Sequence, residues 1–372
     1  MSAPAPPFTD RVSRNLVHRI QTACRLSVQE LNFHRPARLL VGVSGGPDSS
    51  ALLLALMPIA PREDWSIVAA HIDHGIAPAA DRQRFRDAAH AVADRAGVPL
   101  HVIPVNVPAS VARTGESVEA VARTLRYQAL VQLAASGFAP GHPADAIVVG
   151  HTMDDQAESV LLHLIRGSGT DGLAGMSPTS VVPLPDTTTP LLRPALGLRR
   201  AEMRRLCAVA GLDPAIDAAN ADPRYTRVRI RQHILPALAA INPAIVSRLA
   251  ALAGAVTVDR ALLEQLTDNA LPQVVLPPHA LSHHEAAGPT HPPLARAGLS
   301  RRGLQRQPLA IRARLLRRHV LAAGGEPPDW NRTGALLRLV QRGGHRVQCA
   351  GGVVVEARQD RLCFRRDGAR AP

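Results

Sequence analysis

A glycine-rich loop follows an apolar run near the amino end of the sequence. It reads SGGPDSS at residues 44–50 and lies between the run Leu39–Val43 and a helix expected near residues 49–57. Backbone N–H groups at such a junction can converge on an anion that also meets the positive end of the helix dipole. The candidate phosphate ligands are Ser44, Gly45, Gly46, Pro47, Asp48 and Ser49.

Two interpretations of this loop are open. The glycines let the main chain approach a phosphate closely, and the serine hydroxyls add donors. Asp48 can cap the helix or hold a magnesium ion that bridges phosphates. The structural alternative is a tight turn from strand to helix with a Ser or Asp cap. We favour phosphate binding.

A second polar stretch, GHTMDDQAE at residues 150–158, combines a histidine with carboxylates. If a helix begins near Met153, then Asp155 and Glu158 lie three residues apart on one face and His151 precedes the first turn. The carboxylates could hold magnesium or take a proton. Acidic residues also favour a helix amino terminus for electrostatic reasons alone, which is the alternative explanation.

Two further groups of residues give weaker signals. A histidine at a strand end is commonly structural, so His71, Asp73 and His74 in the stretch HIDHG are supporting candidates only. A group at helical spacing fits either ligand contact or a solvated, salt-bridged face. Its members are Glu119, Arg123, Arg126 and Tyr127.

Three arginines alternate in the stretch YTRVRIR. Arg227, Arg229 and Arg231 would align in a strand or loop, whereas a helix would spread them around its axis. Guanidinium groups bind phosphate through two hydrogen bonds, so these side chains could clamp a phosphate.

The composition excludes several kinds of chemistry. All 43 residues counted as Lys+Arg are arginine, which excludes a Walker-type loop and a Schiff-base lysine. The cysteines form no CxxC pair, so neither a disulfide framework nor a zinc or iron–sulfur site is indicated. We expect Cys24, Cys207, Cys349 and Cys363 to be small core residues.

Apolar runs alternate with helical stretches in the first half of the sequence. The runs are Leu39–Val43, Ile67–Ile72, Leu100–Val107 and Ala146–Val149, and the helices are expected near 49–57, 80–96, 117–135 and 154–166. This alternation predicts an α/β fold with a doubly wound parallel sheet. Ligands of such folds bind outside the carboxyl ends of the strands, and the stretches SGGPDSS, HIDHG and GHTMDDQAE fall there. They should surround one crevice.

Three regions are predicted along the chain. Residues 1–232 form the catalytic domain, 233–300 a helical extension that ends in a linker or insertion, and 301–372 a small basic α+β unit. The linker prediction rests on residues 269–300, which are rich in Pro, His, Ala and Gly. The last region has helices near 308–322 and 332–342 and strands at Arg346–Cys349, Val353–Ala357 and Leu362–Phe364.

The charge predicts a polyanionic partner. The formal net charge is +13, and residues 301–372 hold 16 arginines against 5 acidic residues, which is +11 of the total. Aromatic residues make up only 2% of the chain, so phosphate contact is favoured over base stacking. A solvated, arginine-rich face is the alternative. No charged leader followed by an apolar stretch opens the sequence, and we expect a soluble, cytoplasmic protein without membrane contact.

These motifs carry a resemblance to a known family. SGGPDSS resembles the pyrophosphate-binding loop of the N-type ATP pyrophosphatases, which split ATP between the α- and β-phosphates to adenylate a substrate. Within that superfamily the sequence resembles the tRNA(Ile)-lysidine synthases over roughly residues 38–236. The blocks that carry the match are HIDHG, the helix from Glu119 to Tyr127, residues 150–176, LLRPAL at 191–196 and DPRYTRVRIRQHILP at 222–236.

The resemblance implies a two-step ligation that uses ATP and Mg²⁺. The C2 oxygen of the wobble cytidine of tRNA(Ile) with anticodon CAU would attack the α-phosphate, and free L-lysine would then displace AMP to give lysidine. The modified base pairs with A instead of G, so the codon changes from AUG to AUA. The C-terminal unit resembles the basic tRNA-binding appendage of that family, and a second copy of the chain is a further candidate partner.

The resemblance also implies roles for residues. Asp48 would assist the phosphate and metal site together with Asp155, and His151, Asp155 and Glu158 would hold metal or lysine and move protons. Phosphate or the tRNA backbone would be steadied by Arg229, or by its neighbours Arg227 and Arg231. The runners-up are another tRNA-modifying enzyme of the superfamily, such as a thiolase, and a non-enzymatic RNA-binding protein.

Overall fold

The structure is a computed structural model of the chain. It describes residues 8–33, 36–136, 142–185, 187–215, 222, 224–277, 298–344 and 346–366. Two compact units are present. The first comprises Met1–Arg166 and Ala174–Gly254, and the second comprises Gly167–Leu173 and Ala255–Pro372. Helix α11 (Ile245–Val274) contributes to both units, because the division falls within it.

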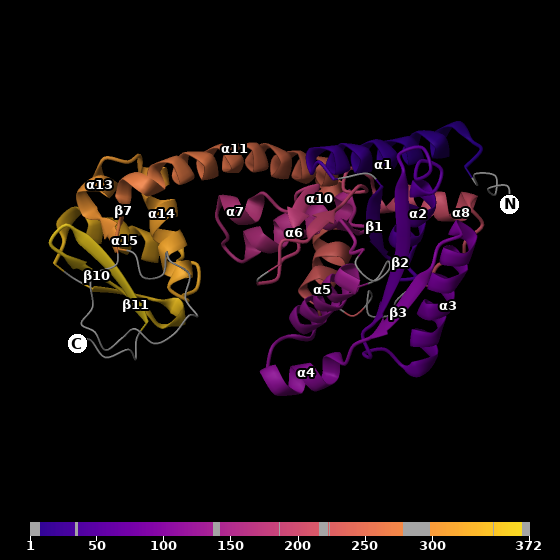
Figure 1. Cartoon of the computed structure of the whole chain (residues 1–372), viewed down its shortest axis with the longest axis horizontal. Coiled ribbons are helices and arrows are strands. Elements are labelled where there is room, and N and C mark those ends of the chain that lie inside the picture. Colours follow the sequence, from indigo (N-terminus) through magenta and orange to yellow (C-terminus); the bar gives the residue numbers. More distant parts are fainter. Residues whose placement is uncertain are drawn as a thin grey trace. The chain divides into compact units, whose positions relative to one another are not determined.

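A six-stranded sheet forms the centre of the first unit (Figure 1). Its order is β3-β2-β1-β4-β6-β5, and all neighbours pair in parallel except β5 and β6. The strands are β1 (Ala37–Gly42), β2 (Trp65–Asp73), β3 (Leu100–Pro104), β4 (Ala146–Val148), β5 (Thr179–Val181) and β6 (Pro190–Leu192). The predicted parallel α/β sheet is therefore confirmed.

Helices cover both faces of this sheet because alternate residues of its strands point to opposite sides. Leu39 and Val41 of β1 belong to one apolar cluster, whereas Leu40 belongs to another. The first cluster includes residues of α1 (Arg11–Glu30), α2 (Pro47–Leu56), α3 (Ala79–Ala96) and α8 (Arg200–Val209). The second includes residues of α5 (Val118–Ser136). A doubly wound sheet results.

One predicted strand is shorter than its apolar run. The run Leu100–Val107 was expected as a single strand, but β3 ends at Pro104 and Val107 begins helix α4 (Val107–Thr114). Local capping explains the difference, since Asn106 accepts a 3.0 Å hydrogen bond from the Ala109 N–H and a proline occupies the first turn. These helix-start signals outweigh the apolar character of the run.

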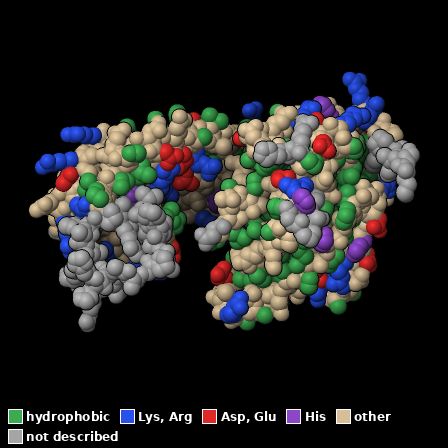
Figure 2. All heavy atoms as spheres, viewed as in Figure 1, with side chains coloured by type: hydrophobic (Ala, Val, Ile, Leu, Met, Phe, Trp, Pro, Cys, Tyr) green, Lys and Arg blue, Asp and Glu red, His purple; other side chains and the backbone are tan. Residues whose placement is uncertain are grey.

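The second unit contains an antiparallel sheet of order β7-β8-β11-β10-β9. Its strands are β7 (Val275–Leu276), β8 (Gly298–Ser300), β9 (Arg346–Cys349), β10 (Val353–Arg358) and β11 (Arg361–Arg366). Its helices include α13 (Arg301–Gln305), α14 (Leu309–Ala322) and α15 (Trp330–Arg342). The small α+β unit predicted at the carboxyl end is confirmed, and on the face shown in Figure 2 it carries arginine side chains at its surface.

The predicted linker differs from the structure at its start. Residues 269–274 continue helix α11 instead of beginning a linker, and Ala270 and Val274 are buried in the core of the second unit. Apolar residues at helical spacing thus extend the helix beyond the point where composition suggested its end. Residues 278–297, which make up most of the predicted insertion, lie outside the described residues.

A short segment of the motif at residues 150–176, Gly167–Leu173, belongs to the second unit. Helix α7 (Thr170–Leu173) follows α6 (Met153–Ile165), and Asp171 forms a 3.2 Å ion pair with Arg314 of α14. The Arg314 guanidinium also pairs with Glu264 of α11 at 2.8 Å. The Arg314 side chain is nearly buried. These contacts fix α7 to the second unit.

No single helix among the described residues is long and apolar enough to cross a membrane. One pair of consecutive helices, Thr226–Ile241 and Ile245–Val274, is long and apolar enough when the two are taken together, but the pair is bent by 97°.

Candidate active site

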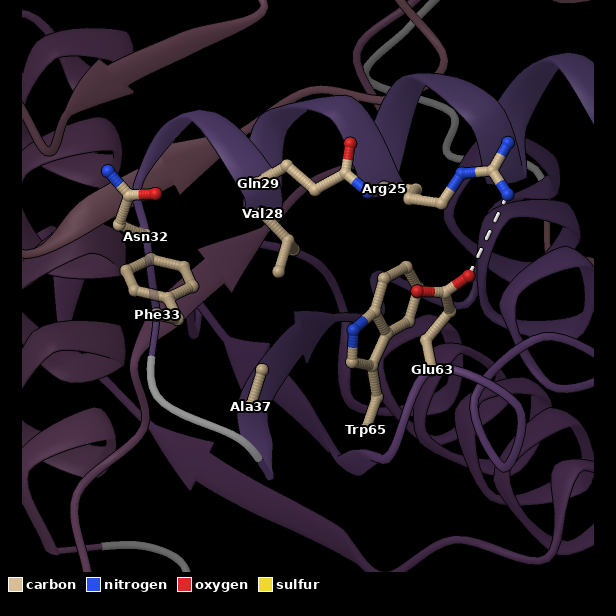
Figure 3. Close-up of a pocket in the computed structure, with 8 residues that line it drawn as sticks. All are labelled: Arg25, Val28, Gln29, Asn32, Phe33, Ala37, Glu63 and Trp65. Carbon is tan, nitrogen blue, oxygen red and sulfur yellow. Dashed lines mark ion pairs between the residues drawn. The ribbon is translucent and has the colours of Figure 1, made fainter.

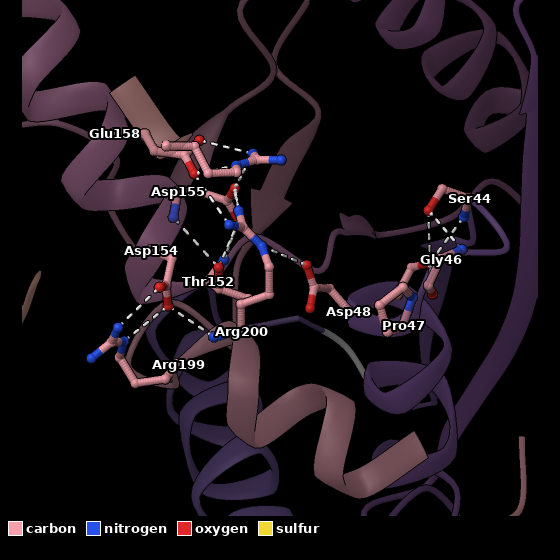
Figure 4. A network of polar contacts seen from close by, with 12 residues as sticks. Ser44, Gly46, Pro47, Asp48, Thr152, Asp154, Asp155, Glu158, Arg199 and Arg200 are labelled. Carbon is pink, nitrogen blue, oxygen red and sulfur yellow. Dashed lines mark hydrogen bonds and ion pairs between the residues drawn. The ribbon is translucent and has the colours of Figure 1, made fainter. Parts of the chain in front are cut away.

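The glycine-rich loop joins β1 to α2 and is held by hydrogen bonds among its own residues (Figure 4). The Ser49 hydroxyl accepts a 3.0 Å bond from the Ser44 N–H and donates one of 3.2 Å to the Gly46 carbonyl. Gly46 is the N-cap of α2, and no side chain caps the helix there. The amino end of α2 is consequently left with backbone N–H groups that can meet an anion.

Two glycines bring the loop close to neighbouring backbone. Gly45 has φ of 80°, and a Cβ atom at this position would lie 2.5 Å from the carbonyl oxygen of Phe85. A Cβ atom on Gly150 would lie 3.0 Å from the backbone of Asp48 and Ser49. The second polar stretch thereby approaches the phosphate loop directly, as the position of both at the carboxyl edge of the sheet predicted.

The acidic stretch forms the start of α6. Thr152 caps the helix, and its N–H and hydroxyl each donate a 2.8 Å hydrogen bond to Oδ2 of Asp155. This capping box fixes one carboxylate oxygen and leaves Oδ1 free to face another group. Glu158, one turn later, is fully buried. Both the predicted helix start near Met153 and the shared face of Asp155 and Glu158 are confirmed.

Arg200 joins the acidic stretch to the phosphate loop (Figure 4). Its guanidinium lies 2.5 Å from Asp155, 3.1 Å from Glu158 and 3.5 Å from Asp48. No sequence motif singled out this residue. Arg199 and Arg200 stand at the amino end of α8, where the helix dipole disfavours positive charge. That unfavourable placement was the signal of an acidic partner.

The electrostatic state of the site follows from burial and from these contacts. Burial, followed by the neighbouring Asp155, raises the pKa of Asp48 to about 6. Burial also acts to raise the pKa of Asp155, but Arg200, His151 and the hydrogen bonds from Thr152 together outweigh it and hold this pKa below its usual value. Burial lowers the pKa of Arg200, yet Asp155, Glu158 and Asp48 together raise it above normal. Arg200 therefore stays charged among these three carboxyl groups.

The arginines of the stretch YTRVRIR lie in helical segments, first in α9 (Thr226–Arg229) and then in the π-helical turn η2 (Ile230–Ile234). They are therefore spread around the helix axis and do not align as they would in a strand. Arg231 forms ion pairs with Glu158 at 2.7 Å and Asp155 at 3.9 Å. Arg227 pairs with Glu119 at 3.1 Å. Arg229 is exposed, so Arg231 is the member that reaches the carboxylates.

Two of the HIDHG residues, His71 and Asp73, hold neighbouring elements in place. Nδ1 of His71 lies 2.9 Å from the carbonyl oxygen of Val43, which ties the end of β2 to the entry of the phosphate loop. Asp73 is buried and forms 2.7 Å ion pairs with both Arg82 and Arg86 of α3. Hydrogen bonding to Arg82 lowers the pKa of Asp73 to about 2. Both contacts position the elements around the loop.

Two arginines of α5, Arg123 and Arg126, surround Tyr127 and act on His151. Arg123 and Arg126 place their guanidinium carbons 5.2 and 5.1 Å from the centre of the Tyr127 ring, and this tyrosine is 1% exposed. Burial lowers the pKa of His151 to about 3, although Asp155 acts in the opposite direction. Burial likewise lowers the pKa of His74 to about 4, assisted by Arg126. The contacts of Tyr127 exclude a purely solvated helix face.

The residues near the loop suit a magnesium ion that also binds phosphate oxygens. Oδ1 of Asp48 is buried and has no hydrogen-bond partner in the described structure, and Asp155 presents a second carboxylate. Among the described residues no three His, Cys, Asp or Glu side chains form a closed metal site. One or two carboxylates completed by phosphate and water are typical of magnesium, so the donor set fits.

A separate cavity opens at the other end of β1 and β2 (Figure 3). It is lined by Arg25, Val28, Gln29, Asn32, Phe33, Ala37, Glu63 and Trp65. Ala37 and Trp65 begin their strands, so this cavity lies at the amino edge of the sheet, away from the loop and the acidic stretch. It takes no part in the site.

Solved structures support the fold. The U34-tRNA thiolase NcsA from Methanococcus maripaludis superposes with a TM-score of 0.52 at 15% identity, covering 65% of this chain and 79% of that one. At 15% identity, this similarity shows only that the two proteins share a fold.

Sequence comparisons identify the family. A family model described as a PP-loop domain matches residues 16–238. A relative from Salinispora tropica is 38% identical over 371 residues, which is 97% of this chain and 97% of the relative. Another from Thermobifida fusca is 37% identical and covers 87% of this chain and 86% of the relative. Both relatives are tRNA(Ile)-lysidine synthases, and with this identity over nearly the whole length the chain belongs to the tRNA(Ile)-lysidine synthase family of PP-loop proteins.

Proposed function

We propose that this protein is a ligase that joins free lysine to C2 of the wobble cytidine of tRNA(Ile) with anticodon CAU, in two steps of which the first consumes ATP. The observation that carries the proposal is the meeting of a phosphate loop with Asp48, Asp155 and Glu158 around Arg200, in a chain of this family. A reaction that cleaves ATP beside a nucleophilic base requires both a phosphate cradle and groups that manage charge and protons.

The first step needs stabilisation of the leaving pyrophosphate. The C2 oxygen of the cytidine attacks the α-phosphate of ATP, the bond to the β-phosphate breaks, and an adenylated cytidine forms. The uncapped amino end of α2 and the hydroxyl of Ser44 supply donors to the departing phosphates. The positively charged side chain of Arg200 lies at the same edge. These groups are already in place, so they reorganise little as charge develops.

The second step needs an amine without its proton. The lysine amine attacks C2, a C–N bond forms, and AMP departs with the oxygen of the base. We assign the removal of this proton to His151 and Glu158, because Asp48 and Asp155 would hold the magnesium ion. Asp155 and Glu158 attract the ammonium group.

Magnesium completes the proposed site. When bound, the ion would neutralise charge on the phosphates. Asp48 and Asp155 would hold it, because Oδ1 of Asp48 lacks a partner and Asp155 faces the same space. Arg200 now lies between these carboxylates and would have to yield part of its contact with them.

The positive charge of the second unit supports contact with the tRNA backbone. Residues 301–372 carry +11 of the formal charge, and a basic surface binds phosphates without regard to sequence. We further propose that this unit holds the tRNA while residues 1–232 act on the anticodon base. Homodimerisation stays a prediction, which the apparent mass in size-exclusion chromatography would test.

The decisive experiment supplies the purified protein with a tRNA(Ile) CAU transcript, Mg²⁺, ATP and labelled lysine. The proposal predicts lysine incorporation and AMP release that both disappear when the wobble cytidine is changed to uridine. Release of AMP on another RNA without lysine incorporation would instead favour a different modification such as thiolation. RNA binding without ATP consumption would favour a non-enzymatic RNA-binding protein.

A further inference from the structure

The second unit exposes one aromatic side chain beside a row of arginines. Trp330 begins helix α15 and is 72% exposed. The other tryptophan of the chain, Trp65, is buried, and no further aromatic side chain is exposed among the described residues. A single exposed apolar residue needs no explanation by itself. The neighbours of Trp330 therefore decide what its exposure means.

These neighbours form a ridge along the surface of α15. Gly334, Arg338 and Arg342 follow Trp330 at intervals of four residues, and such a series makes one inclined ridge of a helix. The two arginines are exposed. The other side of the helix packs into the core of the second unit through its buried residues Leu336, Leu339 and Val340. The ridge is thus the side of α15 that the core does not use.

The Arg338 side chain turns back along the ridge toward Trp330. A Cβ atom on Gly334 would lie 3.5 Å from Nη1 of Arg338, so the guanidinium lies beside the bare backbone of Gly334. Gly334 is about one turn, or about 6 Å along the axis, from Trp330. An indole, a gap without a side chain and a cation therefore follow one another along the ridge.

Among the described residues, no carboxylate pairs with the arginines of this ridge. Helix α15 contains three arginines and no acidic residue. The acidic residue before it, Asp329, caps the helix by accepting a 2.6 Å hydrogen bond from the Arg332 N–H. Arg338 and Arg342 are consequently available to an anion from outside the chain, in the region that holds +11 of the formal charge.

We propose that Trp330 stacks on an unpaired base of the bound tRNA and that Arg338 and Arg342 contact the adjoining phosphates. This inference rests on the proposed function, which makes tRNA the substrate. Unpaired RNA bases stack on aromatic side chains, and every base has a π face, so the contact requires no particular base. The low aromatic content still argues against a platform for several bases, because one indole holds one base.

The composition of the ridge favours RNA over a protein partner. An aromatic anchor of a protein interface lies at the centre of a patch that is poor in charged residues. The exposed residues of α15 besides Trp330 are all polar or charged, namely Asn331, Arg332, Arg338, Gln341 and Arg342. Guanidinium groups next to an aromatic ring instead match a strand in which bases and phosphates alternate.

The first test measures the Kd of the whole chain for a tRNA(Ile) CAU transcript. Trp330→Ala should raise Kd about tenfold, as for the loss of one stacked base, and Trp330→Phe should recover most of that loss. Leu309→Ala is the matched control, because Leu309 is an exposed apolar residue that begins α14 of the same unit. Equal Kd values for Trp330→Ala and the wild type would overturn the proposal.

The second test separates the base contact from the phosphate contacts. Arg338→Gln should lower the slope of log K against log salt by about 1, whereas Trp330→Ala should leave the slope unchanged. A blunt RNA duplex without unpaired bases should bind the wild type and Trp330→Ala equally. If Trp330→Ala also lost tenfold on the duplex, or if Arg338→Gln left the slope unchanged, the assigned contacts would be wrong.

Fluorescence reports on the indole directly. In Trp65→Phe, Trp330 is the sole tryptophan of the chain. Saturating tRNA should then reduce both its emission and its quenching by acrylamide, because a stacked base covers the ring. Emission and quenching that stay the same in the complex would contradict stacking, whatever the effect of the substitutions on Kd.

These measurements keep the inference apart from the ligase function. Lysine incorporation by the wild type together with equal Kd values would reject the stacking contact and leave the ligase standing. Normal tRNA binding by Trp330→Ala with loss of self-association in sedimentation would assign Trp330 to a contact between copies of the chain, and so overturn the RNA contact. Failure of the wild type to bind the tRNA at all would refute the proposed function itself.

Discussion

Arg200 donates a 2.5 Å hydrogen bond from Nη2 to Oδ1 of Asp155. The two residues come from α8 and α6, and the pair lies within reach of Glu158 and Asp48. Carboxylates so close together repel one another in a buried site, and a guanidinium is the cation that the chain itself provides. Arg200 thus serves these carboxylates as an internal counter-ion.

Removing this counter-ion should be strongly destabilising. In Arg200→Gln the carboxylates of Asp155 and Glu158 lose a shared partner whose side chain is 15% exposed. Breaking a buried ion pair from one side costs about 3–5 kcal/mol of unfolding free energy. Urea unfolding at neutral pH measures the change.

The neighbouring residue provides the matched control. Arg199 is 41% exposed and pairs only with Asp154 among the carboxylates of the described residues. Arg199→Gln should therefore cost at most about 1 kcal/mol. If the two variants lost equal stability, the account of Arg200 as the central counter-ion would be wrong.

Asp155 and Asp154 should differ sharply in their effect on activity. Asp155→Asn keeps the size of the side chain but removes the charge that faces Arg200 and the proposed magnesium ion. We expect lysine incorporation to fall about a hundredfold or more with the far-ultraviolet circular dichroism unchanged. Asp154→Asn alters a carboxylate that meets Arg199 and the Arg200 N–H, and should retain most activity. Wild-type turnover in Asp155→Asn would refute the assigned role.

Gly45 should tolerate no side chain. In Gly45→Ala the left-handed backbone costs about 1–2 kcal/mol, and the new Cβ would lie 2.5 Å from the Phe85 carbonyl oxygen. The loop must shift, so we expect a raised KM for ATP and a lower melting temperature. Gly197→Ala is the control, because a Cβ there meets nothing within 4 Å. Unchanged ATP kinetics in Gly45→Ala would contradict the proposed phosphate cradle.

Asp73 should contribute stability that depends on pH. Its pKa is lowered from 3.8 to about 2 in the folded protein by its hydrogen bond with Arg82. A lowered pKa means that this contribution is complete above the unfolded value and is lost as pH falls through the folded value. Asp73→Asn should therefore be less stable than wild type by about 1–3 kcal/mol at neutral pH.

The difference between the two proteins should shrink at low pH. Urea unfolding at about pH 7, 5 and 3 would follow it, with an equal difference at the first two values and a smaller one at the third. Arg84→Gln, which alters a mostly exposed side chain on the same helix, should give a difference near zero throughout. A gap between wild type and Asp73→Asn that stayed constant at about pH 3 would contradict the proposed pairing.

Local sequence patterns were sufficient for most elements. The continuous Val, Ile and Leu runs predicted β1, β2 and β4 because strands covered on both faces have no polar side to display. The run at Leu100–Val107 was misjudged where Asn106 and a proline start α4. Helix α1 was not predicted, although Asp10 caps it and its buried residues Leu16, Ile20 and Cys24 recur at helical spacing.

The sequence by itself determined the phosphate loop, the acidic stretch and the parallel sheet, because backbone geometry and short-range spacing dictate these features. Only the tertiary structure decided which arginines complete the site. Arg200 lies 45 residues from Asp155 and Arg231 lies 73 residues from Glu158, so no local pattern links them. Arg229 and Arg231 have the same type and similar neighbours, yet one is exposed and the other reaches a buried carboxylate. The direction in which η2 packs against α6 makes that choice, and it depends on burial that spans the whole domain.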